Sequence, residues 1–169
     1  MIHVYQPSIE PKKTSLESDL KDLVRKTDAG TIQVATAYLS IYGADFITKM
    51  AGKMGGSGHR AVVGISQRVT QPEAIHKLID AGIDVRLGEV SNGIFHPKLL
   101  VGLKRQGRIA QPVCSYIGSA NITFGGLRKN SECAECSDEV GKAERVHEAL
   151  NIFWESAHKA TKKALTEYE

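Results

Sequence analysis

The sequence predicts an α/β fold in a single domain, in which helices flank both faces of a mixed β-sheet. Three patterns indicate this fold. Helical spacing of apolar residues alternates with short β-branched runs in the first half of the chain, consecutive strands follow, and a long amphipathic segment closes it. The 169 residues can bury one core, and they contain no internal repeat and no linker. We therefore expect one domain spanning residues 1–169.

The first half of the chain predicts alternating elements. A short strand over 2–5 is followed by a helix over 15–26, where Leu16, Leu20 and Val24 recur at helical spacing. Apolar, β-branched runs are typical of buried strands, and the intervening segments end at glycine-containing turns. The further expected elements are strands over 31–40, 59–65 and 83–87 and helices over 44–54 and 72–81.

The second half predicts strands that pair directly with one another. These strands are expected at 95–103, 113–118 and 132–137. Residues 140 to about 166 are expected to form one long helix with Val146, Leu150 and Trp154 on one side. Strands separated by helices pair in parallel and consecutive strands pair antiparallel, so the predicted sheet is mixed.

The composition is ordinary for a globular protein, with 41% hydrophobic and 24% charged residues. A net charge of +3 permits a nucleic-acid partner without requiring one. Three cysteines give no disulfide framework, which suits a reducing compartment. The N-terminus resembles no export signal, and no apolar run approaches the length of a membrane span. We expect a cytoplasmic protein with no membrane partner.

Side chains that could take part in catalysis lie between residues 95 and 132. His96 and Lys98 are two apart on an extended segment, so they project from one face and pair a nucleophilic nitrogen with a positive charge. Ser119 and Asn121 add a hydroxyl and an amide in a turn that exposes backbone N–H groups. Such groups can hold a phosphate and attack it without a metal or cofactor.

Four sequence elements follow one another in this chain: His96-x-Lys98, Gly118-Ser119-x-Asn121-x-Thr123, Gly126-Leu127 and Asn130-x-Glu132. Together they resemble the active-site signature of the phospholipase D superfamily. Because one copy is present, the chain is most similar to the single-motif nucleases of that superfamily. The resemblance implies a phospholipase D-like half-unit with five catalytic residues: His96, Lys98, Ser119, Asn121 and Glu132.

One position departs from the family pattern. The family motif usually carries an aspartate five residues after the lysine, and this chain has Leu103 there. In the family that aspartate is structural more often than it contacts substrate. The catalytic set is therefore expected to remain present.

Three polar residues of the motif have proposed supporting roles. Glu132 is expected to accept the Nδ1 proton of His96, so that Nε2 faces the substrate. Thr123 and Asn130 either orient neighbouring groups at the substrate or only cap the short segment after Asn121.

A basic stretch separates the two strands of the motif. Lys104, Arg105 and Arg108 lie in an expected hairpin. Such residues form a solvated loop by default, but their closeness in sequence to His96 also fits contacts with a nucleic-acid backbone.

Cys133 and Cys136 form a C-x-x-C pair without a second pair of ligands. On a strand their thiols would point to opposite faces, so buried small apolar side chains are expected in place of a metal site.

The expected mechanism needs two histidines. Attack on phosphorus requires a neutral imidazole, whereas expulsion of the leaving oxygen requires a protonated one. Resemblance to the single-motif nucleases implies a homodimer whose twofold axis brings two copies of His96 into one active site. Metal-independent DNA cleavage through a covalent phosphohistidine is the leading hypothesis, with RNA as an alternative substrate.

Three alternatives remain open at this stage. The chain could be a phospholipid phosphodiesterase, although no apolar rim or interfacial helix is evident. It could be a nucleic-acid-binding module that has lost turnover, for which Leu103 is the best support. It could also be the catalytic part of a restriction-type enzyme that works with a separate DNA-recognition domain or subunit.

Overall fold

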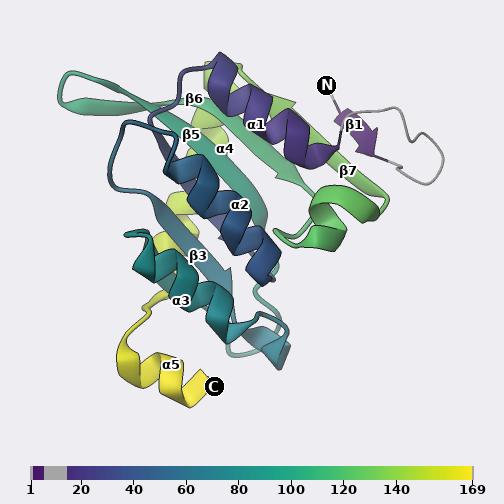
Figure 1. Ribbon diagram of the computed structural model, residues 1–169, viewed down its shortest axis with the longest axis vertical. Helices are drawn as coiled ribbons and strands as arrows, with labels where there is room; N and C mark the ends of the chain where they lie inside the picture. Colours follow the sequence, from purple (N-terminus) through teal and green to yellow (C-terminus); the bar gives the residue numbers. More distant parts are fainter. Residues whose placement is uncertain (1, 6–14, 169) are drawn as a thin grey trace.

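The computed structural model describes residues 2–5 and 15–168. Its strands are β1 (Ile2–Tyr5), β2 (Thr31–Thr36), β3 (Arg60–Gly64), β4 (Asp84–Gly88), β5 (Lys98–Gln106), β6 (Ile109–Gly118), β7 (Glu132–Ser137) and β8 (His158–Lys159). They form one sheet in the order β1-β7-β6-β5-β2-β3-β4-β8 (Figure 1). The strands β2, β3 and β4 are parallel, and the other neighbouring pairs are antiparallel. The predicted mixed sheet is confirmed.

Helices cover both faces of this sheet, as predicted. They are α1 (Leu16–Lys26), α2 (Ile41–Ala51), α3 (Pro72–Asp80), α4 (Val140–Ser156) and α5 (Lys162–Tyr168). In Figure 1, α1, α2 and α3 lie in front of the sheet and α4 lies behind it. Two apolar clusters follow from this arrangement, one under α1 to α3 and a smaller one under α4.

Local signals explain where the first two helices begin. The hydroxyl of Ser15 accepts a hydrogen bond from the backbone N–H of Ser18 at 3.2 Å, which caps α1. The hydroxyl of Ser40 does the same for Gly43 at 3.2 Å. The cap at Ser40 makes α2 begin at Ile41, three residues before the predicted start, and the preceding strand end at Thr36.

The predicted long C-terminal helix is wrong beyond residue 156. At Ala157 the backbone becomes extended, with φ −88° and ψ 152°. The guanidinium of Arg86 donates to the carbonyl of Trp154 at 2.6 Å, so a side chain from β4 takes the place of the next helical turn. The chain then pairs with β4 as β8 and ends in α5, where Leu165 and Tyr168 are buried.

Strand alternation decides which side chains of β7 face which helices. Glu132 and Ala134 are buried on the side of α1, whereas Cys133 and Glu135 point to the side of α4. The expectation of two buried thiols is wrong for Cys133, which is exposed because α4 leaves that end of β7 uncovered. In the described ranges, no helix is long and apolar enough to cross a lipid bilayer.

Candidate active site

The motif residues meet at one end of the sheet. The register pairs Thr36 at the end of β2 with Lys98 at the start of β5, and Gly118 at the end of β6 with Ala134 near the start of β7. Two strands therefore end and two begin at this edge, and the connections between them carry the polar side chains. Crevices at such strand ends commonly bind ligands in α/β folds.

His96 and Lys98 lie on one face, as their spacing predicts, and their side chains are in direct contact. The Nζ of Lys98 lies 2.9 Å from Nδ1 and 3.1 Å from Nε2 of His96, and it donates to the His96 carbonyl at 3.0 Å. The imidazole is exposed while Lys98 is only 7% exposed. A buried ammonium group therefore contacts a solvent-facing imidazole.

The residue before His96 is anchored in the core. The ring of Phe95 is 4% exposed and packs edge-on against Phe153 of α4, with ring centroids 5.4 Å apart. A Cβ at Gly88 would overlap this ring, so the close packing requires glycine there. Anchoring Phe95 limits the backbone motion of His96.

Glu132 is held by two hydrogen bonds from its own chain. The hydroxyl of Ser119 donates to Oε2, and Nδ2 of Asn130 donates to Oε1 at 3.2 Å. The same Ser119 hydroxyl accepts from the backbone N–H of Cys133 at 3.0 Å. Ser119 therefore links the end of β6 to the start of β7.

The expected hydrogen bond between Glu132 and His96 is not formed among the described residues. The strand β6 lies between β5 and β7, so the segments that carry the two residues are about 10 Å apart across the sheet. Glu132 acts instead on Lys98. Burial lowers the pKa of the Lys98 ammonium group, and the negative charge of Glu132 raises that pKa in opposition.

The segment after β2 joins the two halves of the motif and was not predicted as part of the site. The backbone N–H of Tyr38 donates to Oδ1 of Asn121 at 3.3 Å, and Thr36 Oγ1 accepts from the N–H of Ile122 at 3.2 Å. The N–H of Ala37 donates to the carbonyl of Pro97 at 2.8 Å. No sequence signal links this segment to residues 60 to 86 positions later.

A π-helical turn, η2 (Gly125–Lys129), follows Asn121 and was also not predicted. The hydroxyl of Thr123 accepts from the N–H of Gly126 at 3.1 Å, so Thr123 caps this turn, which favours the second of its predicted roles. Asn130 orients Glu132, as already described. A Cβ at Gly126 would overlap the Asn121 carbonyl, so this close approach requires glycine.

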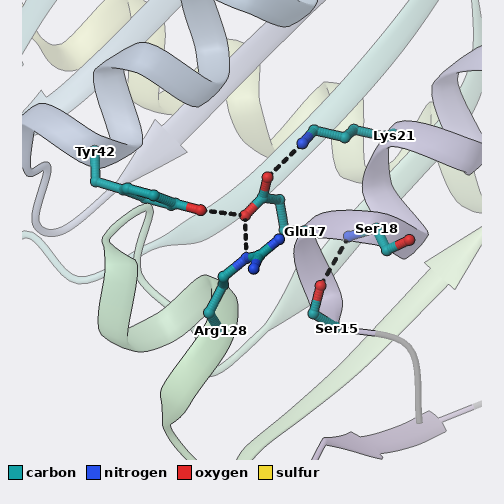
Figure 2. A network of polar contacts seen from close by, with 6 residues as sticks. All are labelled: Ser15, Glu17, Ser18, Lys21, Tyr42 and Arg128. Atoms are coloured by element: carbon teal, nitrogen blue, oxygen red, sulfur yellow. Dashed lines mark hydrogen bonds and ion pairs between the residues drawn. The ribbon is translucent and has the colours of Figure 1, made fainter. Parts of the chain in front are cut away.

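The turn η2 is fixed to two helices through Glu17 of α1 (Figure 2). The Arg128 guanidinium donates to Oε2 of Glu17 at 2.7 Å, and the Tyr42 hydroxyl of α2 donates to the same oxygen at 2.5 Å. Lys21 pairs with Oε1. Burial acts to raise the pKa of Glu17, but the bonds from these three partners outweigh it and lower the pKa to about 2.

The basic hairpin lies away from the site. Lys104 is six residues along β5 from Lys98, which places it about 20 Å away at the other end of the strand. Lys104 pairs with Asp28 at 3.0 Å, and Arg105 donates to the Gly107 carbonyl at 3.1 Å. The basic residues are close to His96 in sequence but not in space, because the two ends of an extended strand are far apart. The three basic residues, Lys104, Arg105 and Arg108, do not join the motif residues.

Leu103 is also remote from the motif. It is 5% exposed and belongs to the apolar cluster under α4. Position 103 is far from the edge of the sheet where His96 lies. Leucine in place of the family's aspartate therefore takes no polar group away from that edge.

The site is an open face of the protein. A groove of about 580 Å³ lies between α1 and α2, but none of the predicted site residues lines it. His96 and Ser119 are exposed, so the face is accessible to a large substrate or to a second protein chain.

Comparisons with known proteins find likeness in structure but not in sequence. No protein-family model and no curated protein matches the chain. The structure of Nuc from Salmonella typhimurium, described as a phospholipase D family member, has a TM-score of 0.64 and 20% identity, covering 96% of this chain and 99% of Nuc. The chain has the phospholipase D fold. At this identity the likeness establishes the fold alone.

Two other proteins with the phospholipase D fold show the same correspondence. NucT from Helicobacter pylori has a TM-score of 0.65 at 16% identity, covering 94% of this chain and 98% of NucT. Yeast tyrosyl-DNA phosphodiesterase has a TM-score of 0.52 at 12% identity, covering 81% of this chain but 31% of its own length. The fold implied by the motif resemblance is therefore confirmed.

Proposed function

We propose that the chain is a metal-independent phosphodiesterase that cleaves DNA in an active site shared by two copies. The observation that carries this proposal is the exposed imidazole of His96 with a buried ammonium group 2.9 Å from it. The likeness to yeast tyrosyl-DNA phosphodiesterase supports both the chemistry and the class of substrate.

The first step forms a covalent intermediate. A neutral imidazole nitrogen of His96 attacks phosphorus, a P–N bond forms, and the bond from phosphorus to the departing ester oxygen breaks. The His96 of the second copy gives its proton to that oxygen. In the second step the same histidine takes a proton from water, whose oxygen attacks phosphorus and breaks the P–N bond.

The other motif residues stabilise charge. Lys98 supplies a fixed positive charge beside the phosphate, and Glu132 favours the charged form of Lys98. The Oδ1 of Asn121 is engaged by Tyr38, so the Asn121 amide N–H groups can donate to a phosphate oxygen. Ser119 acts mainly by holding Glu132.

Two copies of the chain complete the site in this proposal. One imidazole cannot be base and acid at once, and a pair of neighbouring imidazoles favours one neutral and one charged ring. The open face around His96 can meet its own copy across a twofold axis. We expect little sequence preference from this chain alone, so a separate domain or subunit would supply DNA recognition.

Plasmid cleavage in excess EDTA tests the proposal. Wild-type protein should nick plasmid DNA, and His96→Ala should lose this activity while keeping its fold. His158→Ala, which changes an exposed histidine on β8, is the matched control and should cleave normally. An alkaline quench during turnover should trap a phosphohistidine at position 96, detected by mass spectrometry.

Four outcomes would contradict the proposal. Cleavage that EDTA abolishes and magnesium restores would exclude the metal-independent mechanism. Cleavage by His96→Ala would exclude His96 as the nucleophile. Retention on DNA without cleavage would identify a binding module, and hydrolysis of a lipid dispersion in preference to DNA would change the substrate class.

A further inference from the structure

We propose that Tyr38 is a positioning residue for His96 and that Gln67 holds Tyr38 in place. Neither residue belongs to the motif. The inference deepens the proposed function. Its activity measurement rests on that function, whereas its NMR measurement does not.

The first observation is the contact between the two rings. The centroids of Tyr38 and His96 are 6.1 Å apart, and the ring planes are inclined at 76°. This edge-to-face geometry is favourable for aromatic pairs. Lys98 contacts the nitrogens of the same imidazole. Since His96 is exposed, contact with the Tyr38 ring limits the rotation of the His96 side chain.

The second observation concerns the hydroxyl of Tyr38. It donates to Oε1 of Gln67 at 3.0 Å. Gln67 belongs to the short turn η1 (Ser66–Arg68), and both Gln67 and Arg68 have left-handed backbones, with φ of +62° and +53°. Each such residue costs about 1 kcal/mol or more outside glycine, and strained conformations persist where the surrounding structure fixes them.

The turn η1 also contacts the segment that carries His96. The backbone N–H of Phe95 donates to the hydroxyl of Ser66 in a long hydrogen bond of 3.4 Å. The turn therefore contacts the residue before His96 and, through Gln67, the ring beside His96. A strained turn that touches the site twice is suited to fixing the direction of the imidazole.

The third observation separates the backbone of Tyr38 from its side chain. The backbone N–H of Tyr38 holds Asn121, and any non-proline substitution keeps that group. Side-chain variants of Tyr38 therefore alter the support of His96 without removing the hydrogen bond to Asn121. The two effects can be measured apart.

The test compares Tyr38→Phe, which keeps the ring and removes the hydroxyl, with Tyr38→Leu, which removes both. Gln67→Gly removes the acceptor and tolerates the left-handed backbone. The first readout is the NMR chemical shifts of the His96 ring, which sense the orientation of a neighbouring aromatic ring. Tyr38→Leu should shift the His96 signals strongly, and the other two variants should shift them less. Signals of His76 and His158, outside the site, should stay unchanged.

The second readout is steady-state cleavage of a phosphodiester. A misplaced nucleophile lowers kcat, so Tyr38→Leu should reduce kcat roughly 10- to 100-fold while KM changes little. Tyr38→Phe should retain most of the activity, and Gln67→Gly should resemble Tyr38→Phe.

Unchanged His96 shifts in Tyr38→Leu would overturn the inference, and so would an unchanged kcat in that variant. If the wild-type protein cleaves no phosphodiester, the proposed function fails while the NMR measurement still decides the positioning role. If Tyr38→Leu does not fold, Tyr38→Phe and Gln67→Gly decide: equal shifts of His96 support the inference, and no shift in either refutes it.

Discussion

Lys98 shows how one residue combines burial with charge. Its ammonium group lies between the His96 ring and the His96 carbonyl, and its pKa is lowered by burial and raised by Glu132. A compact ammonium fits this position. A planar guanidinium requires more room and a different arrangement of acceptors.

We therefore expect Lys98→Gln and Lys98→Arg both to reduce kcat by roughly 100-fold or more. Lys98→Gln loses the positive charge that the proposal places at the phosphate. Lys98→Arg keeps a positive charge, but its guanidinium does not fit where the ammonium group contacts His96. Cleavage of a chromogenic phosphodiester measures the effect. Lys159→Gln, a lysine change on the edge strand β8, should leave the rate unaltered. Near-normal activity of Lys98→Arg would show that charge alone matters at this position.

The Ser119 hydroxyl supports structure as well as the site. Ser119→Ala would leave the Cys133 N–H without its acceptor and would leave Glu132, which is 9% exposed, with one donor fewer. We expect a loss of about 1–3 kcal/mol of stability, measured by chemical denaturation. Ser137→Ala removes a half-buried hydroxyl of the same strand β7 that accepts from the Glu139 N–H in a solvent-exposed hydrogen bond, and this change should cost much less. Equal effects of the two changes would contradict this assignment.

Single residues were predictable where the signal is local. The two-residue spacing placed His96 and Lys98 on one face, and the two side chains are in contact. The motif resemblance grouped Ser119, Asn121 and Glu132 with them, and these residues lie at the same edge of the sheet. The roles of Tyr38 and Thr36 could not be predicted, since their contacts with His96, Asn121 and Ile122 cross more than fifty residues and depend on which strands become neighbours.

At the scale of elements, Glu17 connects three segments that the sheet alone does not join. It is 6% exposed and receives hydrogen bonds from α1, α2 and η2 (Figure 2). Because η2 leads directly to Asn130 and Glu132, this network fixes the last part of the motif against the helical layer.

The network predicts a pH-dependent stability. The pKa of Glu17 is about 2 in the folded protein and near 4.5 when unperturbed, so its contribution is complete above pH 4.5 and declines as the pH falls toward 2. Glu17→Gln should therefore destabilise the protein by about 2 kcal/mol at pH 7 and by progressively less below pH 4.5. Denaturation at several pH values measures this difference.

Glu167→Gln is the matched control, because Glu167 pairs with Lys163 at 3.8 Å on an exposed part of α5. That change should have little effect at any pH. A constant difference between wild type and Glu17→Gln from pH 7 to pH 3 would contradict the role of the Glu17 charge.

Elements were predicted well where periodicity decides them and poorly where tertiary contacts do. The apolar spacing predicted a helix over 15–26, close to the observed α1, and the strand predicted over 132–137 matches β7. The end of α4 depends on Arg86 and on pairing between β4 and β8, neither of which leaves a local signal. The distance of the basic hairpin from the site follows from the length of β5, which extends three residues beyond the predicted strand.

At the scale of the whole molecule, the proposed shared site predicts how mixed assemblies behave. When wild-type chains are mixed with excess His96→Ala chains and allowed to exchange, each mixed pair lacks one of the two histidines. Activity should fall with the square of the wild-type fraction. A linear decline, measured by plasmid nicking, would show that each chain works independently.

Cys133 is a native cysteine to which a spin label can be attached, so the pairing of two chains can be measured without introducing a new cysteine. Its thiol is exposed on the side of β7 opposite Glu132, whereas burial raises the pKa of Cys114 and raises that of Cys136 to about 11, so both react slowly. A nitroxide reagent should therefore label one position per chain, one residue from Glu132. Pulsed electron paramagnetic resonance between two labels would then report the distance between the two proposed sites of a pair in solution.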